Sequence, residues 1–214
     1  MNRRLIPRPE WTPRSFLNTF CGGKERFHML LLLLILVTAA SFRTYKLSSF
    51  PPGLYPDEAM NGNNALHAAR TGEYKVFYPE NYGREGLFIN TQAMALKIVH
   101  AKEPWVLRSV RAIFGTLTVL GLFFLVRELF DCATALWASF FMATGFWHIV
   151  FSRIGFRAIS SAFWLIWALY CVLVSYRKLH EGVAFRKVIP GCILGGLLFG
   201  TGFNSYIAIA SLQC

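Results

Sequence analysis

Two adjacent carboxylates, Asp57 and Glu58, follow a stretch rich in proline and aromatic residues, Phe50 to Pro56. Each proline fixes its own backbone torsion and moves the preceding residue out of the helical region, so this stretch should be extended and rigid. Pro56-Asp57-Glu58 then has the composition of a helix start, with acids at the positive end of the helix dipole. Asp57 is placed to act as a general base. The alternative is that Asp57 only caps the helix.

Adjacent side chains on a helix point about 100° apart. Asp57 and Glu58 therefore cannot both face one substrate atom. We expect one of them to act, while the other orients it or pairs with a cation.

Arginines form the second group of candidate residues. Arg108 and Arg111 are three residues apart at the start of an apolar run, so they share a helix face. Arginine at a membrane edge is costly unless it snorkels, pairs or binds an anion, and its guanidinium matches a phosphate. Arg153 and Arg157, between two later runs, offer the same choice. His148, just before them, is expected to be a packed residue rather than a metal ligand.

The carboxylates belong to a segment of about sixty residues, 43–104, that separates the first two apolar runs. It holds six of the eleven acids of the chain: Asp57, Glu58, Glu73, Glu80, Glu85 and Glu103. A structureless loop of this length would be unusual, so the segment should carry its own elements and a function.

Two short helices are predicted in this segment. The first starts at Pro56 and ends at Thr71-Gly72, because glycine favours helix ends. The second is introduced by Gly83-Arg84-Glu85-Gly86. It is amphipathic enough to lie on the bilayer surface, and the residues on one of its sides are Leu87, Thr91, Met94 and Ile98.

The rest of the chain is apolar. It has 214 residues, of which 55% are hydrophobic and only 15% are charged, whereas soluble domains carry about 25% charged residues. Five stretches approach the roughly 20 residues that a helix needs to cross a bilayer: about 27–42, 105–126, 133–151, 159–176 and 188–212. The predicted fold class is an all-α integral membrane protein, with about five transmembrane helices and two short membrane-surface helices.

Basic residues set the orientation. The net charge of +11 lies in short segments that flank apolar runs, which excludes a nucleic-acid partner. Residues 1–26 are basic and should be cytoplasmic, which puts 43–104 outside. An alternative makes the first run a signal peptide cleaved near Thr38-Ala39-Ala40, which also leaves this segment outside. Residues 27–214 end within an apolar run, so we expect them to be the N-terminal part of a longer multi-span domain.

Several motifs follow one another in a characteristic order: Phe42-Arg43-Thr44-Tyr45-Lys46-Leu47, Pro52-Gly53-Leu54-Tyr55-Pro56-Asp57-Glu58-Ala59, Gly83-Arg84-Glu85-Gly86-Leu87-Phe88, and the stretch from Leu107 to Val119. In this order they resemble the GT-C glycosyltransferases of the bacterial protein mannosyltransferase and aminoarabinose transferase type. The resemblance covers nearly the whole chain, and its most specific element is the Asp-Glu pair.

The resemblance implies an inverting enzyme of the cell membrane. Such enzymes take a sugar from a polyprenyl-phosphate carrier and pass it to a protein, lipid or glycan acceptor on the outer face, in contact with membrane lipids. It implies that Asp57 is the catalytic base and Glu58 its catalytic neighbour. The residues expected to bind the donor phosphate or the substrate are Arg84, Glu85, Arg108, Arg111 and Arg153.

The expected chemistry suits these residue types. An acceptor hydroxyl loses a proton as it attacks, and arginines can stabilise the charge that grows on the leaving phosphate. Some family members have an acid in the second outer loop, but residues 152–157 contain none, which argues against a two-carboxylate site there. A divalent metal ion is compatible with the Asp-Glu pair, and so is a metal-free reaction.

Two other functions remain open. A transporter would place ionisable residues at mid-membrane and break its helices around a central site. The Gly195-Gly196 pair and the stretch 200–204 offer such a break. A non-catalytic membrane subunit would tolerate the loss of Asp57.

Overall fold

The computed structural model of the protein describes residues 23–80, 84–154 and 158–204. Most of them are helical. The helices are α2 (Gly23–Thr44), α3 (Pro56–Thr71), α4 (Gly86–Val99), α5 (Pro104–Leu129), α6 (Cys132–Thr144), α7 (Phe146–Arg153), α8 (Ala158–His180) and α9 (Phe185–Asn204), and two strands, β1 (Phe77–Tyr78) and β2 (Arg84–Glu85), pair antiparallel.

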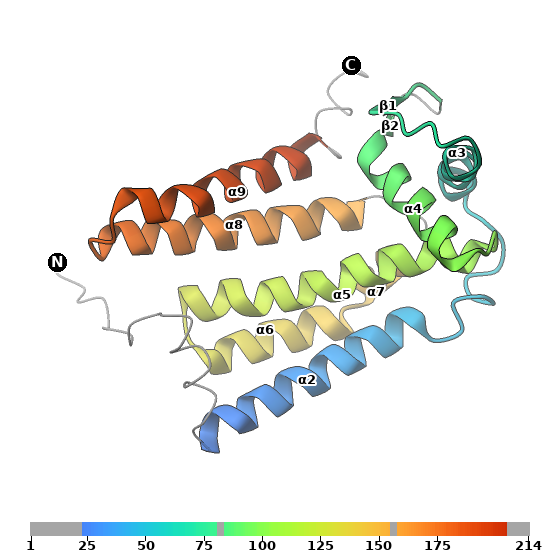
Figure 1. Ribbon diagram of the computed structural model, residues 1–214. Helices are drawn as coiled ribbons and strands as arrows, with labels where there is room; N and C mark the ends of the chain where they lie inside the picture. The colour runs from blue at the N-terminus through green and yellow to red at the C-terminus, as the bar shows by residue number, and fades with distance from the viewer. Residues whose placement is uncertain (1–22, 81–83, 155–157, 205–214) are drawn as a thin grey trace.

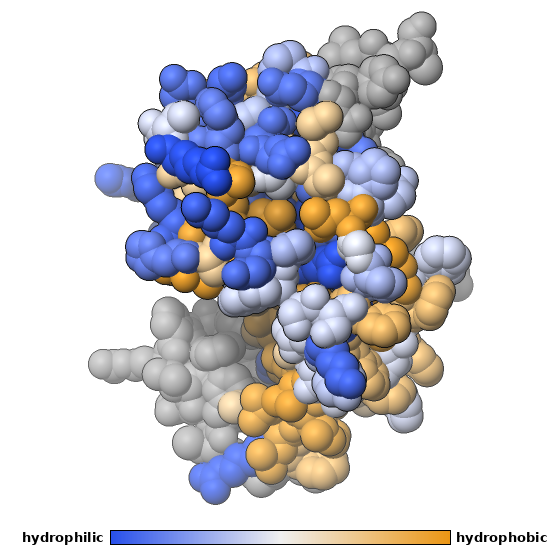
Figure 2. All heavy atoms as spheres, turned by 90° about the vertical axis from the view of Figure 1, so that its right-hand side faces the viewer, coloured by the Kyte–Doolittle hydropathy of each residue, from blue (hydrophilic) through white to orange (hydrophobic). Residues whose placement is uncertain are grey.

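The long helices α2, α5, α6, α8 and α9 lie side by side (Figure 1). Helix α5 packs against α2, α6 and α8, and α8 packs against α9. Helices α3 and α4 and the two strands gather at one end of this bundle, which we call the loop end. Figure 2 looks at the loop end: hydrophilic side chains dominate its upper half, at the height of α3, with hydrophobic ones between and below them.

The membrane architecture is confirmed in its main features. Helices α5 and α8, and α2 from Arg26, are long and apolar enough to cross a bilayer. Helices α6 and α7 are bent by 54° and together make a fourth candidate span. Helix α9 covers the first part of the fifth predicted span. The last part of that span lies outside the described residues, so five spans remain a prediction. Most of the basic segment 1–26 and Arg157 also lie outside the described residues.

The two loop helices form where the sequence predicted them. Helix α3 ends at Thr71, and Gly72 (φ 78°) donates its N–H to the carbonyl oxygen of Ala68. The two helices pack on each other and on the start of α5 through small and aliphatic side chains, including Ala65, Ala68, Ile89, Ala93 and Leu107. The short strand pair was not predicted, because two-residue strands leave no periodic pattern.

Helix α4 carries apolar residues on its outer side as well. Leu87, Met94 and Ile98 are exposed, as the amphipathic pattern predicted. The outer side of α3 is mostly polar and includes Asn63, His67 and Arg70. The structure therefore gives α4, rather than α3, the face that suits a bilayer surface.

The bend between α6 and α7 is held by a buried arginine from α2. Arg43 donates hydrogen bonds to the carbonyl oxygens of Met142 (3.3 Å) and Ala143 (3.1 Å), in the last turn of α6. It also lies 2.6 Å from Nδ1 of His148, at the start of α7. The last carbonyls of a helix lack partners within it and carry partial negative charge, so a guanidinium stabilises the break.

Close packing beside this arginine requires a glycine in α5. A Cβ added at Gly115 would collide with the Ser152 hydroxyl and lie 2.9 Å from its Cβ and 3.1 Å from Nε of Arg43. A rotation of the hydroxyl relieves only the first of these contacts. Gly115 therefore sets the distance between α5, α7 and α2.

We predict that Gly115→Ala lowers the free energy of unfolding by about 1–3 kcal/mol, the usual cost of overpacking. The matched control is Gly196→Ala in α9, where an added Cβ meets nothing within 4 Å among the described residues. Thermal unfolding of the purified protein in detergent measures both. Equal unfolding temperatures for the two variants would contradict the close packing at Gly115.

Candidate functional site

A buried carboxylate fastens α3 to α5. Glu58 is 0% exposed, and its Oε1 accepts hydrogen bonds from Nε of Arg108 and Nη1 of Arg111, both at 3.0 Å. Nη2 of Arg108 also donates to Oε2, at 3.3 Å. The two arginines are three residues apart on one face of α5, as their spacing predicted. Of the possibilities open to them, the structure shows pairing with a carboxylate.

Arg108 also holds the segment that leads into α3. Its Nη1 donates to the carbonyl oxygens of Pro51 (2.9 Å) and Leu47 (3.4 Å), and its Nη2 donates to that of Gly53. With the bonds to Glu58, it makes five hydrogen bonds, as many as a guanidinium has N–H groups. Arg108 thus joins α5 to the proline-rich segment and to the first turn of α3.

A second arginine reaches the same segment from α7. Arg153 donates from Nη1 to the carbonyl oxygen of Phe42 (2.8 Å), and from Nη2 to those of Tyr45 (2.8 Å) and Phe50 (3.2 Å). The connection between α2 and α3 is therefore held from both α5 and α7.

Asp57 has different surroundings from its neighbour. Its side chain is 30% exposed, and its Oδ1 accepts a hydrogen bond from Nη2 of Arg84 at 2.8 Å. The Arg84 side chain is only 8% exposed, so its position is well fixed. The result is a carboxylate that reaches the surface of the loop end while one of its oxygens is held by a buried cation.

The local backbone explains why glycine follows Arg84-Glu85. The N–H of Gly86 donates to the carbonyl oxygen of Val76 (2.7 Å), which closes the short strand pair. A Cβ at Gly86 would collide with the carbonyl oxygen of Lys75 and lie 2.7 Å from that of Val76. The tight crossing fixes β2, and with it the position of Arg84.

Arg111 keeps buried donors that no described residue accepts from. It is fully buried, its guanidinium lies 5.4 Å from the ring centre of Phe88, and Nη1 contacts Glu58. Its Nε and Nη2 have no hydrogen-bond partner among the described residues. The same holds for Nε of Arg84. The two arginines are therefore less fully engaged by the protein than Arg108.

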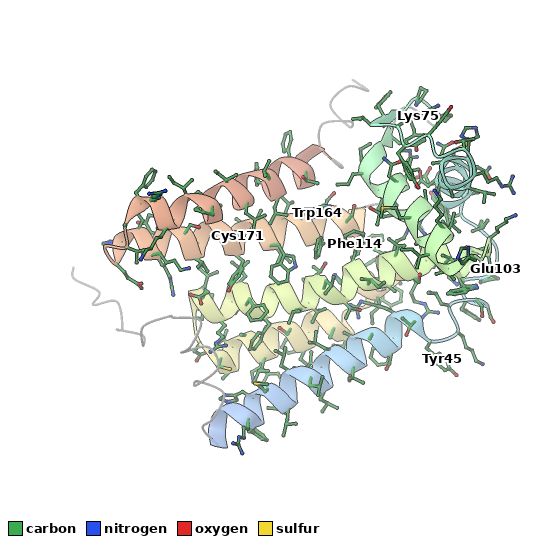
Figure 3. All side chains as sticks on the ribbon, viewed as in Figure 1. Tyr45, Lys75, Glu103, Phe114, Trp164 and Cys171 are labelled. Carbon is green, nitrogen blue, oxygen red and sulfur yellow. The ribbon has the colours of Figure 1, made fainter. Side chains whose placement is uncertain are left out.

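A cleft of about 560 Å³ opens beside α4, between α5, α8 and α9. Its walls are largely aromatic and small residues, and they include Phe114 of α5 and Trp164 of α8 (Figure 3), whose rings contact each other with centres 6.0 Å apart. Glu85 is the acid of its lining. The structure thus places Glu85 at this cleft, next along the chain to the arginine that holds Asp57.

The described residues do not make a metal site. They contain no group of three or more His, Cys, Asp and Glu side chains that could hold an ion. Asp57 and Glu58 are each bonded to arginine. A divalent ion therefore does not fit the side chains described here, and no chemical step is assigned to one.

Arg43 is a structural arginine to which the sequence alone gave no role beyond the motif Phe42–Leu47. Arg43 lies at the end of the first span, just as Arg108 lies at the start of the second. Because an arginine at a membrane edge is costly without a partner, the same argument could have identified Arg43. Its partner His148 was expected to be a packed residue, and the ring is half-buried against Arg43.

No protein-family model matches the chain, and no curated protein matches it. Its fold is similar to that of the oligosaccharyltransferase of the archaeon Archaeoglobus fulgidus. In complex with an inhibitory peptide and a dolichol-phosphate, that protein gives a TM-score of 0.66 at 23% identity over 85% of this chain and 24% of its own. The structure of that protein tethered to an acceptor peptide gives a TM-score of 0.68 at 21% identity, over 89% of this chain and 25% of its own.

A third structure of that enzyme, with Zn and sulfate, gives a TM-score of 0.63 at 23% identity over 82% of this chain and 25% of its own. The chain thus spans about a quarter of the length of these structures. The similarity shows a shared fold over that quarter.

We predict that the two neighbouring acids differ strongly in how much their loss destabilises the protein. Glu58→Gln leaves two buried guanidiniums without a carboxylate and should destabilise the protein by about 3–5 kcal/mol. Asp57→Asn changes a partly exposed ion pair and should cost less than about 1 kcal/mol. Thermal unfolding in detergent, together with the yield of folded protein, measures both. A Glu58→Gln variant as stable as Asp57→Asn would contradict the anchoring role of Glu58.

Proposed function

We propose that the chain is part of a membrane glycosyltransferase that transfers a sugar from a polyprenyl-phosphate-linked donor to an acceptor at the outer face of the cell membrane, with Asp57 as the general base. The observation that carries this proposal is the contrast between Asp57 and Glu58. One first turn of helix provides a buried anchor and a partly exposed carboxylate held by Arg84. The fold shared with an oligosaccharyltransferase supports the reaction class.

In the proposed reaction, the acceptor attacks the anomeric carbon of the sugar, and Asp57 accepts the proton that the acceptor loses. The new bond from the acceptor to that carbon forms on the face opposite the leaving group, so the configuration inverts. The bond between the anomeric carbon and the phosphate oxygen breaks, and the phosphate leaves with the lipid. A positioned base contributes about a hundredfold or more to such a step.

The charge of the loop end suits a phosphate. Four guanidiniums (Arg84, Arg108, Arg111 and Arg153) stand near three carboxylates (Asp57, Glu58 and Glu85) in this region. A net positive site attracts an anionic donor and stabilises the charge that develops on it. We assign the phosphate contact to Arg84, whose guanidinium lies beside the surface carboxylate of Asp57. Arg111 is fully buried and adds positive charge to the site without touching the donor. Glu58 and Arg108 are assigned the positioning of Asp57.

The donor and acceptor classes are proposed on the same basis. The structures of similar fold contain a dolichol-phosphate and an acceptor peptide, which supports a lipid-linked donor and a protein acceptor here. A cytoplasmic N-terminus would place the loop end at the outer face, where such a donor is used. The mannosyltransferase or aminoarabinose transferase type of the sequence resemblance remains the alternative substrate class.

The continuity of α9 counts against the transporter alternative. The sequence offered a helix break at Gly195-Gly196 or within 200–204, and α9 runs through both places, from Phe185 to Asn204. The ion pairs of the described residues lie toward the ends of the bundle, with Glu58 at the loop end and Glu128, 3.0 Å from Arg177, at the opposite one. This distribution suits a site at the membrane edge.

We predict that Asp57→Asn lowers sugar transfer at least about a hundredfold, because the amide cannot accept the proton. The full gene product is assayed in membranes with a radiolabelled polyprenyl-phosphate-linked sugar, and label that leaves the lipid fraction is counted. The matched control is Glu73→Gln, which removes an exposed acid of the same segment and should retain transfer. Full activity of Asp57→Asn, with insertion and stability unchanged, would rule out Asp57 as the base.

A further inference from the structure

We infer that Arg153 is a positioning residue, which fixes the connection between α2 and α3 and through it the place of Asp57. Arg153 lies at the end of α7, far from this connection in the sequence. Its two terminal nitrogens donate to three carbonyl oxygens on the last turn of α2 and the connection. The effect on Asp57 matters for catalysis only if Asp57 is the base proposed above.

The connection needs donors from outside. Its own backbone bonds use the N–H groups of Leu47, Ser49 and Phe50, which donate to the carbonyls of Thr44 and Lys46. Prolines 51 and 52 have no N–H at all. The segment therefore has more acceptors than donors, and a guanidinium supplies donors without adding an acceptor.

Arg108 and Arg153 take different carbonyls of the same segment. Arg108 binds those of Leu47, Pro51 and Gly53, whereas Arg153 binds those of Tyr45 and Phe50. The segment is thus hydrogen-bonded to α5 through Arg108 and to α7 through Arg153. Removing either arginine leaves the segment bonded to one helix only.

The hydrogen bonds of Arg153 to the connection depend on the direction of α7. Helix α7 departs from α6 at a 54° bend, and Arg43 holds this bend through the carbonyls of Met142 and Ala143. Arg153 follows at the end of α7, where it meets the connection. A displacement of α7 would therefore move the segment that precedes Pro56 and Asp57.

A phosphate-binding role for Arg153 makes a different prediction. Three of the five N–H groups of Arg153 already donate to backbone carbonyls of α2 and the connection, so its side chain has a structural role that does not require a phosphate. A positioning residue lowers kcat and leaves KM for the donor unchanged. A phosphate ligand raises KM when it is removed.

The test compares Arg153→Ala and Arg153→Lys with the parent and with Arg177→Ala, which removes an arginine at the opposite end of the bundle. Hydrogen–deuterium exchange of the full gene product in detergent reads the amides of Leu47, Ser49 and Phe50. We expect about tenfold faster exchange in Arg153→Ala, because a loosened segment opens more often. Exchange in α5 should not change.

Arg153→Lys should lie between Ala and the parent, because an ammonium donates up to three hydrogen bonds but lacks the planar fork. Arg177→Ala should leave exchange in the connection unchanged. Unchanged exchange in Arg153→Ala would show that Arg153 does not fix the connection, whatever the sugar-transfer activity of the variant.

Kinetics with the lipid-linked sugar test the consequence for Asp57. We expect Arg153→Ala to lower kcat about tenfold with KM for the donor within twofold of the parent. A raised KM with unchanged kcat would overturn the positioning role in favour of phosphate binding. A parent protein without sugar transfer would overturn the proposed function alone, because the exchange measurement stands without it.

Discussion

The buried carboxylate of Glu58 is the interaction on which the loop end depends. Taking a carboxylate out of water costs several kcal/mol unless charged partners replace the lost hydration. Arg108 and Arg111 provide these partners from one face of α5. The pairing leaves α3 a single position against the bundle, because two guanidiniums of a rigid helix must both reach one oxygen atom.

This constraint also accounts for the exposure of Asp57. The two acids are adjacent, so burying one side chain turns the other about 100° away. Asp57 meets Arg84, which lies across from it on β2 and whose place is fixed by the tight crossing at Gly86. The buried anchor and the proposed base are therefore linked within one helical turn. A general base needs such a fixed position and access to the substrate at the same time.

The sequence predicted the elements well because each of them has a local cause. Prolines, the glycine after Thr71 and the apolar periodicity are enough to place α3, α4 and the main spans. The partners of Arg108 and Arg153 could not be predicted in the same way. Carbonyls in a proline-rich connection follow no period, so their directions depend on how distant helices pack. The bend between α6 and α7 also depends on a distant residue, Arg43.

Three arginines at the loop end supply hydrogen-bond donors to backbone carbonyls that lack them. Arg43, Arg108 and Arg153 all bind backbone carbonyls, at a helix break, a proline-rich connection and a helix end. At each of these places the backbone offers acceptors without matching donors, and near a membrane, water replaces them poorly. A guanidinium has five donors and no acceptor. The prolines of the connection and the arginines that bind it from α5 and α7 are therefore complementary, and replacing these arginines by lysine would keep the charge while leaving carbonyls unpaired.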